Sequence, residues 1–256
     1  MKMLVAIKQV PERDAALRIN AAGSWIDESD LAWSLNESDA YALEEALQLR
    51  DKVGGEVIAL SAGPERVGST LREALAKGAD RAIHVESEDL NGRDALGVAH
   101  LLAAAIAPEN PDLILTGLQS DDLGYGQTGV ILAELLNLPH ASLVLHAEKT
   151  DTGLTVKREL EGGWFQAIEV PTPAVLCIQS GGNKLRYATL MGIKKAKTKE
   201  LRRIRAEDLH AESPRSVTLE RISLPRKQRS TQILTGTPQQ AAAALVEKLS
   251  FEARVL

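Results

Sequence analysis

The sequence predicts an α/β fold: a doubly wound, mainly parallel sheet with antiparallel edge strands and an extended C-terminal arm. Two observations support this prediction. Over the first 140 residues, short apolar runs alternate with amphipathic stretches, a pattern typical of βαβ units and a parallel sheet. After residue 141, short runs follow one another across turn residues with no helical stretch between them, which is typical of antiparallel strands.

The parallel part is predicted from compact apolar runs for the strands and from apolar residues at helical spacing for the helices. In the first helix, for example, Leu43, Ala46 and Leu47 share one face, and Gly54 follows the helix end. Because crossovers between parallel strands are right-handed, we expect helices on both faces of the sheet. The expected strands are 4–7, 56–60, 81–85 and 113–116, and the expected helices are 39–52, 64–77, 94–107 and 127–136.

Two further stretches complete the predicted sheet region. Between the first strand and the first helix, residues 17–20 and 24–27 flank Ala21-Ala22-Gly23, which indicates a small hairpin. After residue 141, Asp-Thr-Gly, Gly-Gly and Pro-Thr-Pro turns separate the apolar runs. These runs predict antiparallel strands over 143–147, 154–160, 164–170 and 174–179.

The C-terminal part differs in charge from the rest of the chain. Residues 184–229 contain 14 Lys or Arg and 5 Asp or Glu, a local charge of +9 within a chain of net charge −5. Residues 200–236 have few apolar residues for a core of their own, and a helix begins at Thr237. We therefore expect an α/β domain over 1–199 and an arm over 200–256 that wraps a partner subunit.

Composition argues against several classes of function. The negative net charge and an aromatic content of 3% argue against a nucleic-acid surface. The one cysteine, Cys177, excludes an internal disulfide, and its apolar neighbours favour a buried thiol. No apolar run approaches the roughly 20 residues of a membrane span, and the first residues are too few for a signal segment. We expect a soluble, cytoplasmic protein.

A ligand site is expected at the edge of the sheet where the parallel strands end. The loops that meet there begin after Ile7, at Asn36, after Leu60 and after Thr116. The last of them, residues 116–129, is rich in glycine and small polar residues, so its backbone amides can approach a phosphate ahead of the next helix. Gln127 and Thr128 add side-chain donors. A flexible loop without a ligand is the alternative at this point.

The familiar catalytic motifs are incomplete. Gly124, Gly126 and Gly129 form a GxGxxG pattern, but it lies seven residues past the strand, so a dinucleotide fingerprint is not indicated. The sequence has no GKS or GKT, no HxxxH or HxH pair and no GxSxG elbow. Asp121 and Asp122 could bind Mg²⁺, although adjacent carboxylates in a polar loop are more often solvated. We expect no catalytic residue and no metal site.

Three segments together resemble the β (small) subunit family of electron transfer flavoproteins, from Met3 to Lys199. The first is the opening strand, Leu4-Val5-Ala6-Ile7-Lys8-Gln9-Val10. The second runs from Val156 to Ile168 and from Pro173 to Cys177, and it matches the family signature at every specified position. The third, Arg186-Tyr187-Ala188-Thr189-Leu190 with Ile193 and Lys195-Ala196-Lys197, is similar to the family's recognition loop.

The resemblance implies an adenine-nucleotide α-hydrolase-like sheet and an electron-carrier subunit, not an enzyme. The β subunit would bind AMP, and the redox FAD would lie mainly on the α subunit of the heterodimer. Two positions depart from the family: Gly126 replaces a residue that is often polar, and Ala62 one that is Cys in some members. By position, the AMP contacts fall on the loops already predicted from the sheet: Ala6, Asn36, Glu37, Ser38, Asp39, Ala62, Gly117, Leu118, Gln119, Ser120, Asp121, Asp122, Leu123, Gly124, Tyr125, Gly126, Gln127 and Thr128.

The resemblance also implies a docking surface for flavin dehydrogenases. Leu190 would insert into a hydrophobic pocket of the partner, and Lys194, Lys195, Lys197 and Lys199 would steer an acidic partner surface. Without the resemblance, Leu190 would be an ordinary core leucine and the lysines a solvated face. The implied docking residues are Tyr187, Leu190, Ile193, Lys194, Lys195 and Lys197.

Two other functions stay open. In an electron-bifurcating member of the family, a second FAD replaces AMP and NADH binds nearby, but the bulky Tyr125 in the loop favours AMP. A stand-alone adenine-nucleotide-binding protein would have to be stable without an α subunit, and the basic arm argues against that. The sequence indicates neither the electron donor nor the acceptor.

Overall fold

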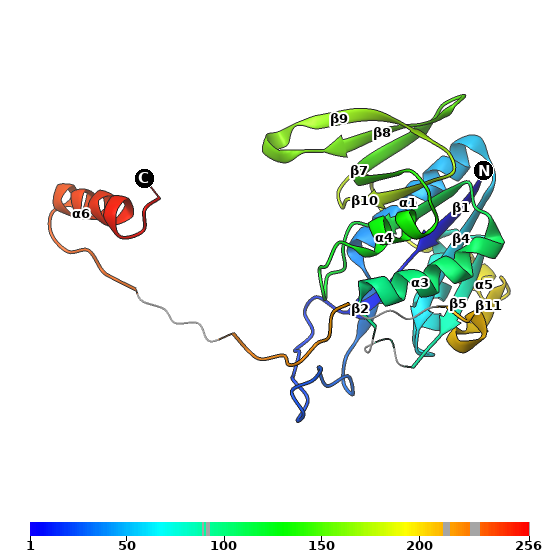
Figure 1. Ribbon diagram of the computed structural model, residues 1–256, viewed down its shortest axis with the longest axis horizontal. Helices are drawn as coiled ribbons and strands as arrows, with labels where there is room; N and C mark the ends of the chain where they lie inside the picture. Colours follow the sequence, from blue (N-terminus) through cyan, green and yellow to red (C-terminus); the bar gives the residue numbers. More distant parts are fainter. Residues whose placement is uncertain (89, 91–92, 212–215, 226–230, 256) are drawn as a thin grey trace. The chain divides into compact units, whose positions relative to one another are not determined.

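The computed structural model describes residues 1–88, 90, 93–211, 216–225 and 231–255 (Figure 1). The chain divides into two compact units, Met1–Arg221 and Ile222–Leu256. The first unit contains the sheet and every residue predicted for the nucleotide site and the docking surface.

Within the described residues, the first unit is built on a nine-stranded sheet of order β11-β5-β4-β1-β6-β10-β7-β8-β9. Strands β11 to β7 run parallel to one another, and β8 is antiparallel to both of its neighbours, β7 and β9. This arrangement confirms the predicted α/β class, with a mainly parallel sheet and antiparallel strands at one edge. The strands are β1 (Lys2–Ala6), β4 (Glu56–Gly63), β5 (Arg81–Glu86), β6 (Leu113–Gly117), β7 (His140–Lys149), β8 (Gly153–Glu159), β9 (Phe165–Pro171), β10 (Ala174–Ile178) and β11 (Leu201–Arg205).

Helices cover both faces of the parallel part, as predicted (Figure 1). Alternate residues of a strand point to opposite faces, so an apolar strand without polar interruptions is buried on both. In β1, Met3 and Val5 join the core formed with α1 and α2, whereas Leu4 and Ala6 join the core formed with α3 and α4. The helices are α1 (Glu37–Val53), α2 (Val67–Lys77), α3 (Ala95–Ile106) and α4 (Thr128–Leu135), with short 3₁₀ turns η1 (Ala107–Glu109), η2 (Glu161–Gly163) and η3 (Ala206–Leu209).

Strand β10 corrects one prediction. The sequence predicts an antiparallel strand over 174–179, and this is wrong, because β10 lies between β6 and β7 and is parallel to both. All five residues of β10 are buried, since a central parallel strand is covered by helices on both faces. The edge strand β9, by contrast, is mostly exposed.

The insert between β1 and α1 is only partly as predicted. Ile19 and Ile26 form a single antiparallel bridge, so the expected hairpin is a short turn instead of two paired strands. A longer pairing lies at the ends of the insert, between β2 (Gln9–Pro11) and β3 (Trp33–Leu35). This pairing brings the end of β1 and the beginning of α1 together.

The basic region after residue 184 contains two regular elements that the sequence did not predict. Helix α5 (Leu190–Ala196) lies inside the predicted recognition loop, and β11 extends the parallel sheet beside β5. Ion pairs of Arg202 with Glu109 (3.1 Å) and of Arg203 with Glu86 (2.9 Å) hold this basic edge strand in place. The sheet therefore includes residues 201–205.

The second unit contains α6 (Pro238–Phe251), the helix predicted from Thr237. A capping box begins it: the Gln240 N–H donates to Thr237 Oγ1 (3.3 Å), and the Thr237 N–H donates to Gln240 Oε1 (2.9 Å). Its apolar residues Leu245, Val246 and Phe251 are exposed. None of the described helices is both long and apolar enough to cross a bilayer.

Candidate functional site

The carboxyl ends of β1 and β6 meet the first turn of α1, and the side chain of Asp39 joins all three. Its Oδ2 atom accepts a hydrogen bond from the Lys8 N–H, and its Oδ1 atom accepts one from the Gly117 N–H, each at 2.8 Å. A single carboxylate thus clamps the ends of two neighbouring strands. Asp39 is a predicted AMP contact, but both its oxygens face backbone donors of the protein.

Burial controls the ionisation of Asp39. Removal from solvent raises the pKa of this carboxyl to about 7, although the N–H donors of Lys8 and Gly117 favour the charged form. Near neutral pH, the clamp therefore exchanges between its charged and neutral forms. The strength of this contact at the site depends on pH.

Asn36 and Ser38 hold the loop between β6 and α4. Asn36 Nδ2 donates to the Gln119 carbonyl (3.0 Å), and Asn36 Oδ1 accepts from the Asp121 N–H (2.8 Å). Ser38 Oγ donates to the same Gln119 carbonyl at 2.6 Å. The polar side chains predicted at the start of α1 are therefore brought to the predicted loop, where they bind its backbone.

Glycine is required at two positions by the closeness of this packing. A Cβ atom on Gly117 would lie 2.3 Å from both Asp39 Oδ1 and Ser38 Oγ, and one on Gly129 would lie 2.5 Å from Cys177 Sγ. Within the loop, Gly124 and Gly126 both have φ of +63°, a conformation that favours glycine. The small residues that predicted the site are thus needed by the backbone geometry itself.

The outer side of the loop faces solvent. Residues 121–127 are exposed, including Tyr125 at 51%. Helix α4 follows at once, and no side-chain hydrogen bond from its N-cap residue, Gln127, caps its first turn. Its first-turn N–H groups remain available to an anion.

Lys8 belongs to the site although it was not among the predicted residues. Its Nζ atom lies 2.7 Å from Asp122 Oδ1 and 3.5 Å from Ser120 Oγ. Partial burial works against ionisation of Asp122, but the Lys8 ammonium outweighs it and holds the pKa of that carboxyl below its usual range. Lys8 follows Ala6 by two residues at the end of β1, so its distance from the sheet edge was the available signal.

The predicted alanines lie on different strands. Ala6 ends β1, and Ala62 lies on β4, beyond the residue paired with Ala6. Because β4 and β6 flank β1 on opposite sides, Ala62 is separated from the 117–128 loop by β1. The structure thus gathers most of the predicted residues around β1 and β6, with Ala62 at the neighbouring strand end.

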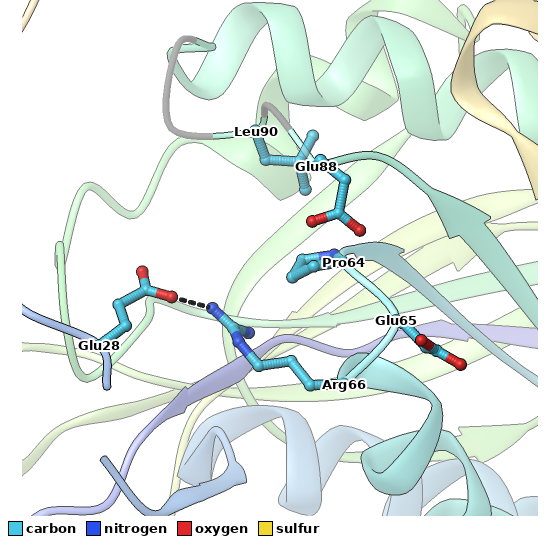
Figure 2. Close-up of a pocket in the computed structure, with 6 residues that line it drawn as sticks. All are labelled: Glu28, Pro64, Glu65, Arg66, Glu88 and Leu90. Atoms are coloured by element: carbon cyan, nitrogen blue, oxygen red, sulfur yellow. Dashed lines mark hydrogen bonds and ion pairs between the residues drawn. The ribbon is translucent and has the colours of Figure 1, made fainter. Parts of the chain in front are cut away.

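A cavity of about 420 Å³ lies at the carboxyl ends of β4 and β5, beside the predicted loops (Figure 2). Arg66 forms an ion pair with Glu28 across it (2.8 Å), and its guanidinium stacks on Trp33 at 3.6 Å. No residue of its lining was predicted as a nucleotide contact. The lining residues are Glu28, Pro64, Glu65, Arg66, Glu88 and Leu90.

The segment predicted for docking, residues 187–197, is displayed on the surface. Tyr187 is 89% exposed and Leu190 is 88% exposed, so Leu190 is not a core residue. Lys194, Lys195 and Lys197 are exposed as predicted. Lys199 differs, because its Nζ donates to the Leu75 and Ala79 carbonyls at the end of α2 and is committed to the fold.

The fold and the loop define an α/β protein with a glycine-rich loop held against the carboxyl edge of a mainly parallel sheet. A family model described as "Electron transfer flavoprotein domain" matches residues 24–209. The chain is 40% identical over 258 residues to "Electron transfer flavoprotein subunit beta" of Methylophilus methylotrophus, covering 96% of this chain and 97% of that protein.

Two further relatives extend along the whole of both chains. The mitochondrial "Electron transfer flavoprotein subunit beta" of Oryza sativa subsp. japonica is 36% identical, and the subunit of the same name from Bacillus subtilis (strain 168) is 34% identical. The chain therefore belongs to the electron transfer flavoprotein β-subunit family, which confirms the resemblance found in the sequence.

Proposed function

We propose that this chain is the β subunit of a heterodimeric electron transfer flavoprotein in the cytoplasm. It binds AMP, supports an α subunit that carries FAD, and docks flavin dehydrogenases for electron transfer, without catalysing a reaction itself. The proposal is supported by family membership and by the loop between β6 and α4, which side chains from the start of α1 hold at the sheet edge.

AMP would lie against the loop between β6 and α4. Its phosphate fits best at Gly126, Gln127 and Thr128, where the first turn of α4 offers N–H groups and the positive end of the helix dipole. Lys8, which pairs with Asp122 at 2.7 Å and keeps a partly exposed side chain, would turn to balance part of the phosphate charge. Asn36, Ser38 and Asp39 would act indirectly, since their polar atoms already bind the backbone that shapes the loop.

The docking segment, residues 187–197, suits a partner with an apolar pocket and an acidic rim. Several apolar side chains are exposed close together at the start of α5, which is more typical of an interaction surface than of isolated surface residues, and exposed lysines follow them in the same helix. These apolar residues are Tyr187, Leu190, Met191 and Ile193. Leu190 would anchor the contact, with the lysines steering the encounter.

Replacement of Leu190 by Ala tests the docking role. We expect electron transfer from a purified flavin dehydrogenase to the heterodimer to fall about tenfold, because anchor residues typically contribute more than 1 kcal/mol. Val53→Ala is the control, since Val53 is also partly exposed (44%) at the far end of α1. Equal rates of electron transfer for wild type and Leu190→Ala, with the heterodimer intact, would contradict the docking role of Leu190.

The α subunit is the proposed partner of the second unit. Helix α6 exposes Leu245, Val246 and Phe251, and an isolated helix of its length is marginal in water. A partner surface would bury some of these apolar side chains. A chain that is monodisperse and binds ATP when expressed alone would instead favour a stand-alone nucleotide-binding protein.

A second candidate stays open, the electron-bifurcating form with FAD in place of AMP. Tyr125 is 51% exposed, so about half of its surface is not packed against the protein. The size of Tyr125 alone therefore does not decide between AMP and FAD. The identity of the bound nucleotides decides it.

A further inference from the structure

Most side chains of the docking segment are exposed, and the segment is anchored at both ends. At its beginning, Arg186 Nε donates to Glu44 Oε2 (2.8 Å) and Arg186 Nη2 donates to Glu44 Oε1 (3.1 Å). The backbone N–H of Arg186 also donates to Glu44 Oε2 (3.2 Å), and Nη2 reaches Asp51 Oδ2 (3.1 Å). Arg186 therefore fixes both the chain and its side chain on α1.

Glu44 is suited to this contact because it lies on the buried side of α1. Its side chain is 5% exposed, and the Arg186 side chain is 31% exposed. A two-pronged guanidinium–carboxylate pair has a defined geometry that a lysine does not reproduce. Without Arg186, the Glu44 carboxylate would remain buried without its cation, so removal of Arg186 alone would be strongly destabilising.

The other end is fixed on α2. Arg72 Nη1 donates to the carbonyls of Ala196 (2.6 Å) and Lys199 (2.9 Å). Helix α5 also packs directly on the α2 backbone, since a Cβ atom on Gly192 would lie 2.3 Å from the Ala76 carbonyl oxygen. The end of the segment therefore cannot move without breaking contacts with α2.

Between these anchors, the apolar side chains that would contact a partner have little support of their own. Tyr187, Leu190 and Met191 are 89%, 88% and 63% exposed, so the fold does not hold them by burial. Their positions follow from the backbone, and the backbone follows from its two ends. Ordering such a segment beforehand removes a cost that binding would otherwise carry.

We propose that Arg186 is a positioning residue for docking, which holds residues 187–193 in the conformation that presents Leu190 to the partner. The inference rests on the proposed docking function. It assigns to Arg186 no contact with the partner: its Nε and Nη2 atoms bind Glu44 and Asp51 on α1.

Hydrogen exchange in the intact heterodimer tests the positioning role without any partner. The Gly192 N–H donates to Thr189 Oγ1 and the Ile193 N–H to the Thr189 carbonyl, so these two amides report the first turn of α5. We expect Arg186→Ala to speed their exchange about tenfold or more, with faster tryptic cleavage after Lys194 and Lys195. Arg186→Lys should rescue only a small part of the protection, because it keeps the charge and loses the fork.

Arg66→Ala is the matched control. Arg66 also forms an ion pair with a glutamate, Glu28, at 2.8 Å, and its side chain is 33% exposed. It should leave the exchange of Gly192 and Ile193 unchanged. Wild-type protection of both amides in Arg186→Ala would overturn the inference.

A second measurement separates this inference from the docking proposal. With a purified flavin dehydrogenase that reduces the wild-type heterodimer, Arg186→Ala should raise the KM for the heterodimer about tenfold, leaving kcat and the salt dependence as in wild type. If Leu190→Ala impairs the reaction and Arg186→Ala does not, the positioning role is wrong. If exchange is faster but neither variant impairs the reaction, the docking proposal fails and this inference fails with it.

Discussion

Replacement of Asp39 by Asn tests whether one buried carboxyl closes the nucleotide loop. Both Asp39 oxygens accept backbone N–H groups, from Lys8 and Gly117, at 2.8 Å. Asn retains one acceptor oxygen and turns an NH₂ group toward the second N–H. A buried donor without a partner costs about 1–3 kcal/mol, which is the destabilisation we expect at pH 5.

The raised pKa of Asp39 makes this effect depend on pH. The pKa is about 7 in the folded protein against 3.8 as its ordinary value, so the folded state binds more protons between these values. The contribution of Asp39 to stability is therefore fully present below pH 3.8, decreases as pH rises through the window and is lost above pH 7. The slope is about 1.4 kcal/mol per pH unit until the carboxyl begins to ionise near its folded pKa, so the loss from pH 5 to 7 is about 2 kcal/mol.

The free energy of unfolding from urea titrations at pH 5, 6, 7 and 8 measures this dependence, with wild type and variant at equal concentration. The destabilisation by Asp39→Asn should shrink by about 2 kcal/mol from pH 5 to 7, so that the variant becomes as stable as wild type or more stable, and then level off. Asp27→Asn is the control, because hydrogen bonds from Ser29 hold the pKa of that exposed carboxyl below its usual range. Its effect should be flat over the same range. A constant or growing effect of Asp39→Asn would refute the raised pKa.

Three further predictions concern the nucleotide loop and the partner subunit. Gly117→Ala places a methyl group 2.3 Å from atoms of the first turn of α1, so the purified heterodimer should lose most of its bound AMP. Gly68→Ala is the control and should retain AMP, because no atom lies near its Cβ position. Nucleotide analysis after denaturation measures both. Lys8→Met should weaken AMP binding about tenfold by calorimetry, because a charge-assisted contact is lost, and the affinity of the variant should depend less on salt. Equal affinity of wild type and variant would exclude Lys8 from the site. Removal of residues 237–256 should weaken capture of the α subunit by the tagged chain, and undiminished capture would exclude helix α6 from the subunit interface.

Most of the fold could be predicted because its strands and helices have clear local patterns. The run Leu4–Ile7 and the helical spacing of Leu43, Ala46 and Leu47 predict β1 and α1 within a few residues. The error at β10 arose from order in sequence, since the strand follows a hairpin but inserts between β6 and β7. The uninterrupted apolar run from Ala174 to Ile178 was the sequence signal for a central strand that is buried on both faces.

Strand β11 and helix α5 could not be predicted in the same way. In β11, Arg202, Arg203 and Arg205 hide the strand pattern, and the ion pairs that stabilise it lie on elements about 100 residues earlier in the chain. Helix α5 is one short helix of seven residues whose stability comes from packing on α2. Such long-range contacts leave no mark on local sequence.

The location of the candidate site could be predicted from the sheet topology, but the roles of its individual residues could not. The ends of the parallel strands predicted that the loops at Asn36 and Thr116 meet. The structure shows in addition that the polar atoms of Asn36, Ser38 and Asp39 bind the backbone of the loop. Lys8 was missed because its residue type alone does not distinguish it, although its position two residues after Ala6 places it at the sheet edge.

We propose that the loop between β6 and α4 holds AMP while FAD lies on the α subunit. Denaturation of the purified heterodimer, followed by chromatographic separation and counting of the released nucleotides, is the decisive measurement. We expect one AMP and one FAD for each heterodimer. Release of two FAD and no AMP would refute AMP binding and would favour the electron-bifurcating form.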